Sequence, residues 1–260
     1  MHKLRLLFIG LIFTLGQAAH AESRYQWRDA SGKVHVGGST PPAGVPFDII
    51  QVPDPIRWRN APDMPTEVSA EGKLSTRDLY KLASQSVYWV LNRKSSGGLD
   101  SSASIFGSAV AISEDLAVTN CHVMVGAGDN AEIGTGDKGD VSPVELVAAN
   151  YVADRCVIRS RTMALRPVAG IRSADSLDIG ENVYAIGNPR QLERTLSEGL
   201  ISGKRMLGEI RMLQTTAPIS PGSSGGGLFD ERGNLVGITT SSLRSAQSVN
   251  FAIPAEDFWQ

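Results

Sequence analysis

Cysteine and histidine are scarce in this chain of 260 residues, which contains two cysteines and four histidines. A zinc ion in a protein is usually held by four side chains, most often cysteine and histidine. Cys121 and Cys156, with one histidine near them, cannot complete such a shell. The sequence therefore predicts no metal site, and nothing in it indicates another cofactor.

Long apolar runs are missing after the first residues. A transmembrane helix needs about 20 apolar residues, and the apolar run at residues 6–15 is shorter. It follows two basic residues and precedes the small-x-small tripeptide 19–21, a pattern typical of a secretory signal peptide rather than of a membrane anchor. We expect cleavage of residues 1–21 before Glu22, and hence a periplasmic or secreted protein without a transmembrane anchor after processing.

Clusters of basic residues are missing as well. The formal net charge of −2 becomes −4 when Lys3 and Arg5 leave with the signal peptide. The remaining basic residues are scattered, whereas nucleic-acid-binding domains concentrate them on one face or helix. We therefore expect no nucleic-acid partner.

A small module and a proline-rich stretch precede the main body of the chain. Two short strands around a turn at residues 29–32 predict a β-hairpin module within residues 22–51. Prolines in residues 52–74 disfavour helices and central strands, so this stretch is predicted to be a linker. Next, Ser75-Thr76 can cap a helix that we expect to end near Gln85.

The main body consists of many short apolar stretches separated by Gly, Pro, Asp and Ser. This spacing is typical of an all-β sandwich or barrel. Residues 95–104 and 126–139 are rich in small residues and predict surface loops. Strands are predicted at residues 87–91, 106–112, 116–120, 144–149, 156–159, 182–186, 196–201, 212–216, 235–239 and 249–253.

A glycine-rich turn around Ser224 is the strongest chemical signal. Residues 222–226 have the sequence Gly-Ser-Ser-Gly-Gly, and glycines let a turn bend tightly and leave the serine hydroxyl and the backbone N–H groups accessible. A serine becomes a nucleophile when a histidine base and a carboxylate support it. The turn therefore predicts acyl-transfer chemistry if such partners exist.

The candidate histidine and carboxylate partners of Ser224 can be reduced to one each by elimination. His122 is the one histidine of the β-rich body, because the others lie in the signal peptide or the hairpin. Taken alone, it could equally be a hydrogen-bonded structural residue. Among the acids, Asp154 leads directly into an apolar strand, whereas its competitors Asp175 and Asp178 do not. The candidate set is His122, Asp154 and Ser224, in that order along the chain.

These motifs resemble the trypsin-like serine proteases of the chymotrypsin fold, and most closely the bacterial HtrA/Deg group. The resemblance implies two six-stranded antiparallel β-barrels, in a protease domain over residues 75–260, with the active site in the cleft between them. Because the sequence ends just past the last expected strand, no PDZ domain is expected. The resemblance rests on eight stretches in order: residues 107–112, 119–123, 154–158, 180–189, 197–202, 214–217, 222–226 and 250–254.

The resemblance also implies a role for each candidate. Ser224 would be the nucleophile, His122 its proton acceptor and Asp154 the group that orients the imidazole. The backbone N–H groups of Gly222, Ser223 and Ser224 would form the oxyanion hole. The expected function is that of an exported serine endopeptidase acting through an acyl-enzyme. The alternative is a catalytically silent envelope protein that keeps the fold for binding.

We expect the substrate specificity and the activation of this protein to differ from those of the digestive serine proteases. Ser223 stands where those enzymes have an aspartate that pairs with a newly cut N-terminus, so we expect no activation by N-terminal insertion. Pro218 stands where trypsin-type enzymes carry the acid of their specificity pocket, so small or medium apolar P1 side chains are expected in place of Arg or Lys. The predicted pocket walls are Ile219, Thr239, Thr240, Ser241, Asn250, Phe251 and Ala252.

The two cysteines flank the candidate histidine and carboxylate. Cys121 precedes His122, and Cys156 follows Asp154 by two residues, so contact between the histidine and the acid would bring the thiols together. Exported proteins keep such pairs oxidised. We predict a Cys121–Cys156 disulfide; the alternative is two buried free thiols.

The N-terminal hairpin resembles a small module found at the start of many bacterial envelope proteins. Its function is unknown, and an isolated hairpin is marginally stable in water. We therefore expect the hairpin to pack on another surface, either the following domain or a cell-envelope partner.

Overall fold

The structure is a computed structural model that divides into two compact units, residues 1–54 and 55–260. The predicted signal peptide lies outside the described residues. In the part of the chain that is described, no helix is long and apolar enough to cross a membrane. The described residues are 22–28, 34–37, 44–52, 55–68, 72–93, 104–124, 131–136, 139–189, 192–208, 210–242 and 249–259.

The N-terminal unit contains a three-stranded antiparallel sheet in the order β2-β1-β3. Strand β1 (Glu22–Arg28) pairs with β2 (Val34–Gly37) as the predicted hairpin, whose turn lies outside the described residues. The third strand, β3 (Phe47–Val52), was not predicted. It is a short β-branched run between Pro46 and Pro53, and prolines commonly border strands that they cannot enter.

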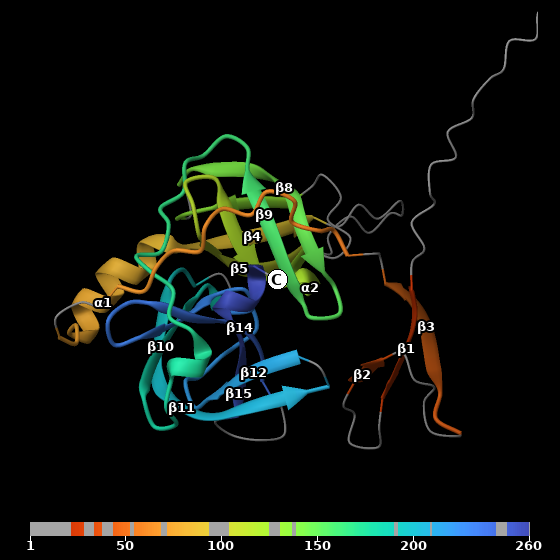
Figure 1. Ribbon diagram of the computed structural model, residues 1–260. Coiled ribbons are helices and arrows are strands. Elements are labelled where there is room, and N and C mark those ends of the chain that lie inside the picture. The colour runs from red at the N-terminus through yellow and green to blue at the C-terminus, as the bar shows by residue number, and fades with distance from the viewer. Residues whose placement is uncertain are drawn as a thin grey trace, which may run out of the picture. The chain divides into compact units, whose positions relative to one another are not determined.

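The second unit contains two closed barrels of six antiparallel strands each, which is a chymotrypsin-like fold and confirms the predicted fold class (Figure 1). The first barrel has the order β4-β5-β6-β9-β8-β7. Its strands are β4 (Val87–Arg93), β5 (Ser104–Ala111), β6 (Leu116–Thr119), β7 (Ala131–Gly134), β8 (Val141–Asn150) and β9 (Arg155–Ser160).

The second barrel has the order β10-β11-β12-β15-β14-β13. Its strands are β10 (Asn182–Gly187), β11 (Thr195–Leu207), β12 (Ile210–Thr215), β13 (Gly227–Asp230), β14 (Leu235–Ser242) and β15 (Asn250–Pro254). The short helices outside the barrels are α1 (Thr76–Ala83), α2 (Cys121–Met124), η1 (Ser84–Ser86), η2 (Ala174–Ser176) and η4 (Ala255–Trp259).

Each strand predicted in the main body overlaps an observed strand, but two observed strands were missed. The predicted surface loop at residues 126–139 is wrong in part, because β7 lies within it and pairs with both β4 and β8. Ile133 is the one large apolar residue of β7. This four-residue segment is a strand because β4 and β8 pair with it on both sides. Strand β13 begins directly after the serine turn. It was not predicted because the glycines at 225–227 indicate a turn and not a strand.

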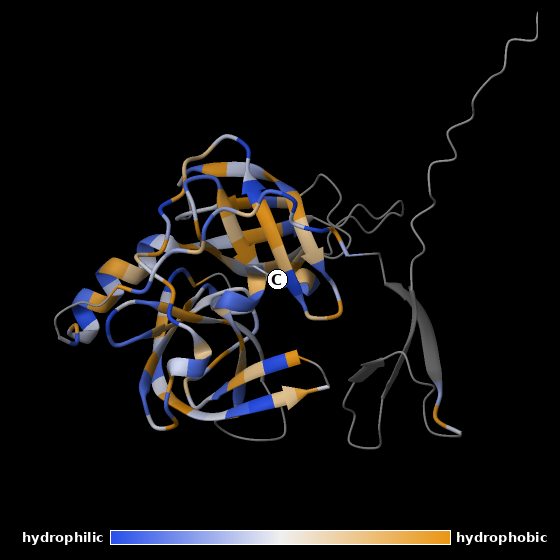
Figure 2. Ribbon diagram, viewed as in Figure 1, coloured by the Kyte–Doolittle hydropathy of each residue, from blue (hydrophilic) through white to orange (hydrophobic). Residues whose placement is uncertain are grey.

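Helix α1 joins the two barrels through its apolar side. Its cap is as predicted: the Ser75 hydroxyl accepts a hydrogen bond from the Asp78 N–H at 3.2 Å. Figure 2 shows that α1 carries both polar and apolar residues, whereas apolar residues dominate several strands of the first barrel. Leu79 of α1 is fully buried in a cluster with Val110 of the first barrel and Phe229 of the second. This cluster holds the barrels together by excluding apolar surface from water.

The described part of the proline-rich stretch lies against the barrels. Ile56 and Ala149 exchange two backbone hydrogen bonds of 2.9 Å. Trp58 packs on Trp259 with ring centroids 5.6 Å apart, and Trp259 Nε1 donates to the Pro62 carbonyl oxygen. Residues 55–68 therefore belong to the second compact unit, and the domain boundaries drawn from sequence stay a prediction.

The predicted disulfide is present between Cys121 and Cys156. Both residues are buried, at 1% and 0% exposure, within the interior of the first barrel. The bond ties the first residue of α2 to the start of β9. It therefore fixes the position of His122, the next residue in the chain.

Arg172 is ion-paired with three carboxylates at the second barrel and the segments beside it. Its guanidinium donates to both Glu181 oxygens, at 2.7 and 3.0 Å, and lies 3.5 Å from Asp230 and 3.8 Å from Glu67. The hydrogen bond from Arg172 is the main reason that the pKa of Glu181 lies below its ordinary value. Because the Arg172 side chain is only 11% exposed, water screens this pair weakly.

Removing the disulfide should destabilise the protein strongly. A disulfide across 35 residues lowers the conformational entropy of the unfolded chain, which raises the unfolding free energy by about 4 kcal/mol. We expect the double variant Cys121→Ala/Cys156→Ala to lose about that much unfolding free energy in urea titrations. The wild type in reductant should behave like the variant, and the variant should not respond to reductant. Equal stability of the oxidised wild type and the variant would contradict this expectation.

The Arg172–Glu181 pair should make stability depend on pH in the acid range. Since the folded-state pKa of Glu181 is lowered, its contribution is present above the ordinary value of 4.5 and is lost as the pH falls below it. We expect Glu181→Gln to lower the unfolding free energy by about 2 kcal/mol at pH 7 and by clearly less near pH 3.5. The check is urea denaturation at both pH values, and a difference that grows on acidification would refute the assignment.

Candidate active site

His122 and Asp154 are in direct contact. His122 lies on the one-turn helix α2 that follows β6, and its Nδ1 is 2.8 Å from Asp154 Oδ2. The other carboxylate oxygen, Oδ1, accepts the His122 backbone N–H at 2.9 Å. The His122 side chain is half exposed, at 50%, so the imidazole edge away from Asp154 is accessible to a substrate.

Asp154 has an unusual backbone conformation. Its φ of +57° lies in the left-handed region, which aspartate tolerates better than most residues. Its carbonyl oxygen accepts hydrogen bonds from Cys121 N at 3.4 Å and from Asn120 Nδ2 at 3.2 Å. The turn before β9 is thus fastened to the start of α2 by one backbone and one side-chain hydrogen bond, and these aim the carboxylate at the imidazole.

The serine turn is shaped by Pro221 and Gly222. The Ser223 N–H donates to the Ser220 carbonyl oxygen at 2.9 Å, and Gly222 has a φ of +98°. These features are those of a type II turn, in which proline is favoured at the second position and glycine at the third. In the described part of the chain, the N–H groups of Gly222 and Ser224 donate to no protein acceptor. They remain available to a ligand oxygen, whereas the Ser223 N–H is already used.

Thr240 connects the serine to the carboxylate. Its hydroxyl donates to Asp154 Oδ2 at 2.9 Å, and its carbonyl oxygen accepts the Ser224 hydroxyl at 2.8 Å. Among the described contacts, Ser224 Oγ is hydrogen-bonded to this carbonyl and not to the His122 ring. The sequence indicated Thr240 only as a wall of the specificity pocket, and it contained no signal for this link between strands.

Two residues without a predicted role hold the serine turn from behind. Ser108 on β5 donates its N–H to the Ser224 carbonyl oxygen and its hydroxyl to the Gly222 carbonyl oxygen, both at 2.8 Å. Asn188 in turn donates its N–H to the Ser108 hydroxyl at 2.9 Å. Both residues are buried, and both lie in motifs that carried the family resemblance. Their chemistry was not visible from sequence because their partners are far away along the chain.

Gly225 permits a close approach of the two barrels. A Cβ atom there would lie 1.9 Å from the Ser108 carbonyl oxygen, and its φ is +86°. Only glycine meets both conditions, since it has no Cβ and adopts positive φ readily.

The predicted pocket residues are distributed over two neighbouring strands and the serine turn. Thr239 is buried and donates to the Ser223 carbonyl oxygen at 2.6 Å, and Asn250 donates to the Ala217 carbonyl oxygen at 2.9 Å. Phe251 and Ala252 are buried on β15, Ile219 is half-buried, and the side chain of Ser241 lies outside the described residues.

A cavity of about 120 Å³ lies against the serine turn. Pro218 and Thr239 line it together with Ser220 and Ser223, and none of its lining residues is charged. The structure thus brings two of the predicted pocket residues to one cavity and leaves the five others whose side chains are described outside its lining.

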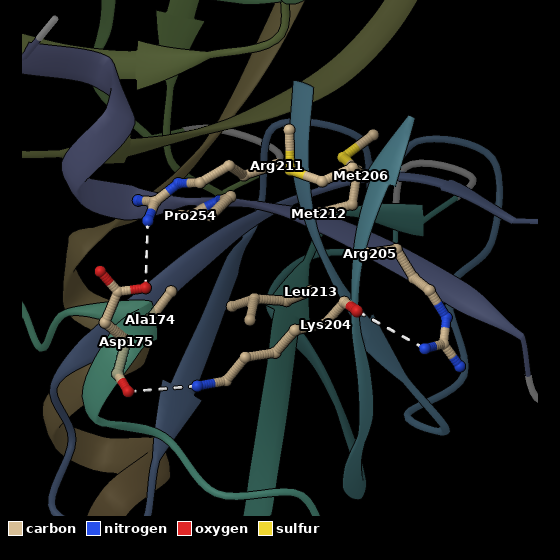
Figure 3. Close-up of a pocket in the computed structure, with 9 residues that line it drawn as sticks. All are labelled: Ala174, Asp175, Lys204, Arg205, Met206, Arg211, Met212, Leu213 and Pro254. Carbon is tan, nitrogen blue, oxygen red and sulfur yellow. Dashed lines mark hydrogen bonds and ion pairs between the residues drawn. The ribbon is translucent and has the colours of Figure 1, made fainter. Parts of the chain in front are cut away.

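Another hollow, of about 160 Å³, lies on the second barrel, and its lining shares no residue with that cavity (Figure 3). Figure 3 shows Arg211 pointing at Asp175, to which it is ion-paired at 3.2 Å. Arg211 also pairs with Glu256 at 2.9 Å and with Asp257 at 2.6 Å. These carboxylates raise the pKa of Arg211, and they occupy its hydrogen-bonding groups. Among the described residues, no His, Cys, Asp and Glu cluster could hold a metal ion.

Comparison with known proteins agrees with this geometry. A trypsin-like peptidase domain matches residues 107–238, just over half of the chain. The chain belongs to the trypsin-like peptidase family. The matched stretch contains His122, Asp154 and Ser224.

The relatives of this trypsin-like chain are Deg/HtrA proteases. Serine endoprotease DegS of Haemophilus influenzae is 32% identical over 200 residues, covering 70% of this chain and 58% of that protein. Putative serine protease HhoB of Synechocystis is 35% identical over 159 residues, covering 58% and 38%. The structure of the HtrA-type protease AlgW with tripeptide is 31% identical with a TM-score of 0.62, covering 70% and 60%. The chain thus spans less than two thirds of each relative.

The contact at Gly225 gives a test of the barrel packing. We expect Gly225→Ala to lower the unfolding free energy by about 3 kcal/mol or more, because the new Cβ clashes with backbone and the positive φ is strained. Gly180→Ala is the matched control: its φ is +100° but nothing lies within 4 Å of the added Cβ, so about 1–2 kcal/mol is expected. Thermal and urea unfolding measure both, and equal losses would mean that the close approach is absent.

Proposed function

We propose that this protein is an exported serine endopeptidase. The observation that carries the proposal is the Asp154 carboxylate, which is hydrogen-bonded at once to His122 and to Thr240, the residue that holds the Ser224 hydroxyl. The family match and the names of the relatives support the same reaction class.

The chemical steps follow from these positions. Ser224 Oγ attacks the carbonyl carbon of the scissile peptide bond while His122 takes its proton. The N–H groups of Gly222 and Ser224 stabilise the negative oxygen of the tetrahedral intermediate, and one such donor contributes about 3–4 kcal/mol in related chemistry. His122 then protonates the departing amine, and the acyl group stays on Ser224. A water molecule, deprotonated by His122, releases the acid product.

Asp154 and Thr240 prepare the histidine for this cycle. The carboxylate keeps Nδ1–H of His122 directed toward itself, which leaves the opposite nitrogen unprotonated as the proton acceptor for Ser224. Before attack, the Ser224 hydroxyl must turn from the Thr240 carbonyl oxygen toward His122. A side-chain torsion between staggered positions is sufficient for that change.

Export is supported by two observations. Disulfides persist in oxidising compartments, and the Cys121–Cys156 bond is buried beside the site. One relative, 32% identical over 168 residues, is named as a probable periplasmic serine endoprotease of Ectopseudomonas mendocina. The predicted signal peptide agrees with export, and N-terminal sequencing of the secreted or periplasmic protein should find Glu22 first.

The proposed substrates are proteins or peptides with a small or medium apolar P1 residue. The absence of an acid at Pro218 and the uncharged lining of the cavity at the serine turn support this preference. The N-terminal module is the proposed contact to a cell-envelope partner. Deleting residues 22–54 should release the protein from that partner in a co-purification experiment.

A fluorophosphonate probe separates the enzyme from a catalytically silent binding protein. Such probes modify only an activated serine, so the wild type should be labelled and Ser224→Ala should not. His122→Ala should also lose labelling while keeping the fold, as circular dichroism would show. Absence of labelling in the folded wild type would favour the silent alternative.

Matched peptide substrates test the specificity. We expect kcat/KM to be about tenfold or more higher with Val than with Arg at P1, because an uncharged pocket leaves a buried guanidinium unpaired. Ser224→Ala, purified in the same way, controls for contaminating proteases. Equal or faster cleavage after Arg would disprove the proposed pocket.

A further inference from the structure

A second cavity, of about 280 Å³, lies beside the start of β4. We call it the arginine cavity, because two arginines line it. Its walls come from η1, β4, the segment after β9 and the residues before β11. The main lining residues are Gln85, Tyr88, Asp140, Met163, Arg166 and Arg194.

The two guanidinium groups are held near each other by neighbouring residues of the chain. Arg166 Nη1 donates to Gln85 Oε1 at 2.6 Å, and Arg194 Nε donates to the Val87 carbonyl oxygen at 3.4 Å. Their anchors are two residues apart, at the junction of η1 and β4. Arg166 is exposed and Arg194 is half-buried. Since both positive charges line one cavity, an anion inside it would be attracted by both.

No described carboxylate forms an ion pair with either Arg166 or Arg194. Asp140 lines the same cavity but is paired with neither. Arg211 in the other hollow differs from them, because its guanidinium forms ion pairs with three carboxylates, one of which is shown in Figure 3. Within the described part of the chain, the acceptors that bind these two arginines are therefore neutral, and no carboxylate balances their charge.

The wall composition indicates what kind of anion fits. Two arginines and Asp140 give the lining a net charge of about +1, which suits a singly charged carboxylate better than a dianionic phosphate. A guanidinium offers paired N–H donors that match a carboxylate. Met163, which is half-buried, and Ala164 line the same cavity beside Tyr88, so the cavity offers apolar atoms to the carbon chain that carries the carboxylate.

We propose that the arginine cavity binds the carboxylate of an acidic peptide. The side chain of a peptide glutamate supplies such a group on a short apolar stem. Arg166 and Arg194 would hold the carboxylate, and Tyr88 and Met163 would contact the stem.

The arginine cavity is connected to the serine turn by hydrogen bonds. The Arg194 N–H donates to Asn188 Oδ1 at 3.0 Å, and Asn188 Nδ2 donates to the Tyr88 carbonyl oxygen at 2.9 Å. Asn188 also binds the Ser108 hydroxyl, which donates to the Gly222 carbonyl oxygen. Arg194 has a φ of +47°, a strained conformation that a ligand on its side chain would help to hold. A bound carboxylate thus stabilises the turn that presents the Gly222 and Ser224 N–H groups, a consequence that rests on the proposed function.

Binding is tested on Ser224→Ala, which removes cleavage as a complication. The probes are acetyl-Glu-Ala-amide, its neutral partner acetyl-Gln-Ala-amide, and inorganic phosphate, each in isothermal titration calorimetry. We expect saturable binding of the Glu peptide and weaker binding of the other two. In that background, Arg166→Gln and Arg194→Gln should each weaken binding about tenfold or more, while the exposed control Arg205→Gln should not.

Several results would overturn the proposal. They are no saturable binding of the Glu peptide, equal binding of the Gln peptide, tighter binding of phosphate, or binding unchanged in both arginine variants with a native circular dichroism spectrum. The link to the serine turn is tested separately, by the rate of fluorophosphonate labelling of the otherwise wild-type enzyme. The Glu peptide should raise this rate several-fold, and Arg194→Gln should abolish the increase.

An unchanged labelling rate despite binding would refute the link. Absence of any labelling would instead refute the proposed peptidase function, while the calorimetric result would still decide whether the carboxylate site exists.

Discussion

The Asp154 carboxylate is the point on which the site depends, because it joins the two barrels. It accepts hydrogen bonds from the backbone and ring of His122, on the helix between β6 and β7 of the first barrel, and from the hydroxyl of Thr240 on β14 of the second. A carboxylate with three donors is held in one orientation, and charge-assisted hydrogen bonds are stronger than neutral ones. The relative position of the barrels is therefore part of the chemistry.

The serine turn depends on the same boundary. The turn belongs to the second barrel, yet its carbonyl groups are held by Ser108 on β5 of the first. Gly225 allows this contact by having no Cβ where the Ser108 carbonyl oxygen lies. The buried cluster of Leu79, Val110 and Phe229 supplies the apolar contact behind it. Packing between the barrels and positioning of Ser224 are thus one structural feature.

Much of this architecture could be predicted from the sequence. The strands follow from short β-branched runs bounded by turn residues, and the cap at Ser75 follows from local hydrogen-bonding chemistry. The single histidine of the main body left one candidate base, and the neighbouring cysteines indicated their disulfide. Strand β7 could not be predicted in this way, because four residues with one large apolar side chain carry too little periodicity.

The sequence by itself determined which groups are available: a serine in a glycine turn, one histidine, an acid ahead of an apolar strand and a type II turn encoded by Pro221-Gly222. The tertiary structure alone decided what those groups touch. Thr240 binds Asp154, and Ser108 binds the Gly222 carbonyl oxygen, although each pair is more than twenty positions apart in the chain. Arg166 and Arg194, which line one cavity, are also more than twenty positions apart. Such contacts are set by how two closed barrels pack, and local sequence patterns carry no record of that packing.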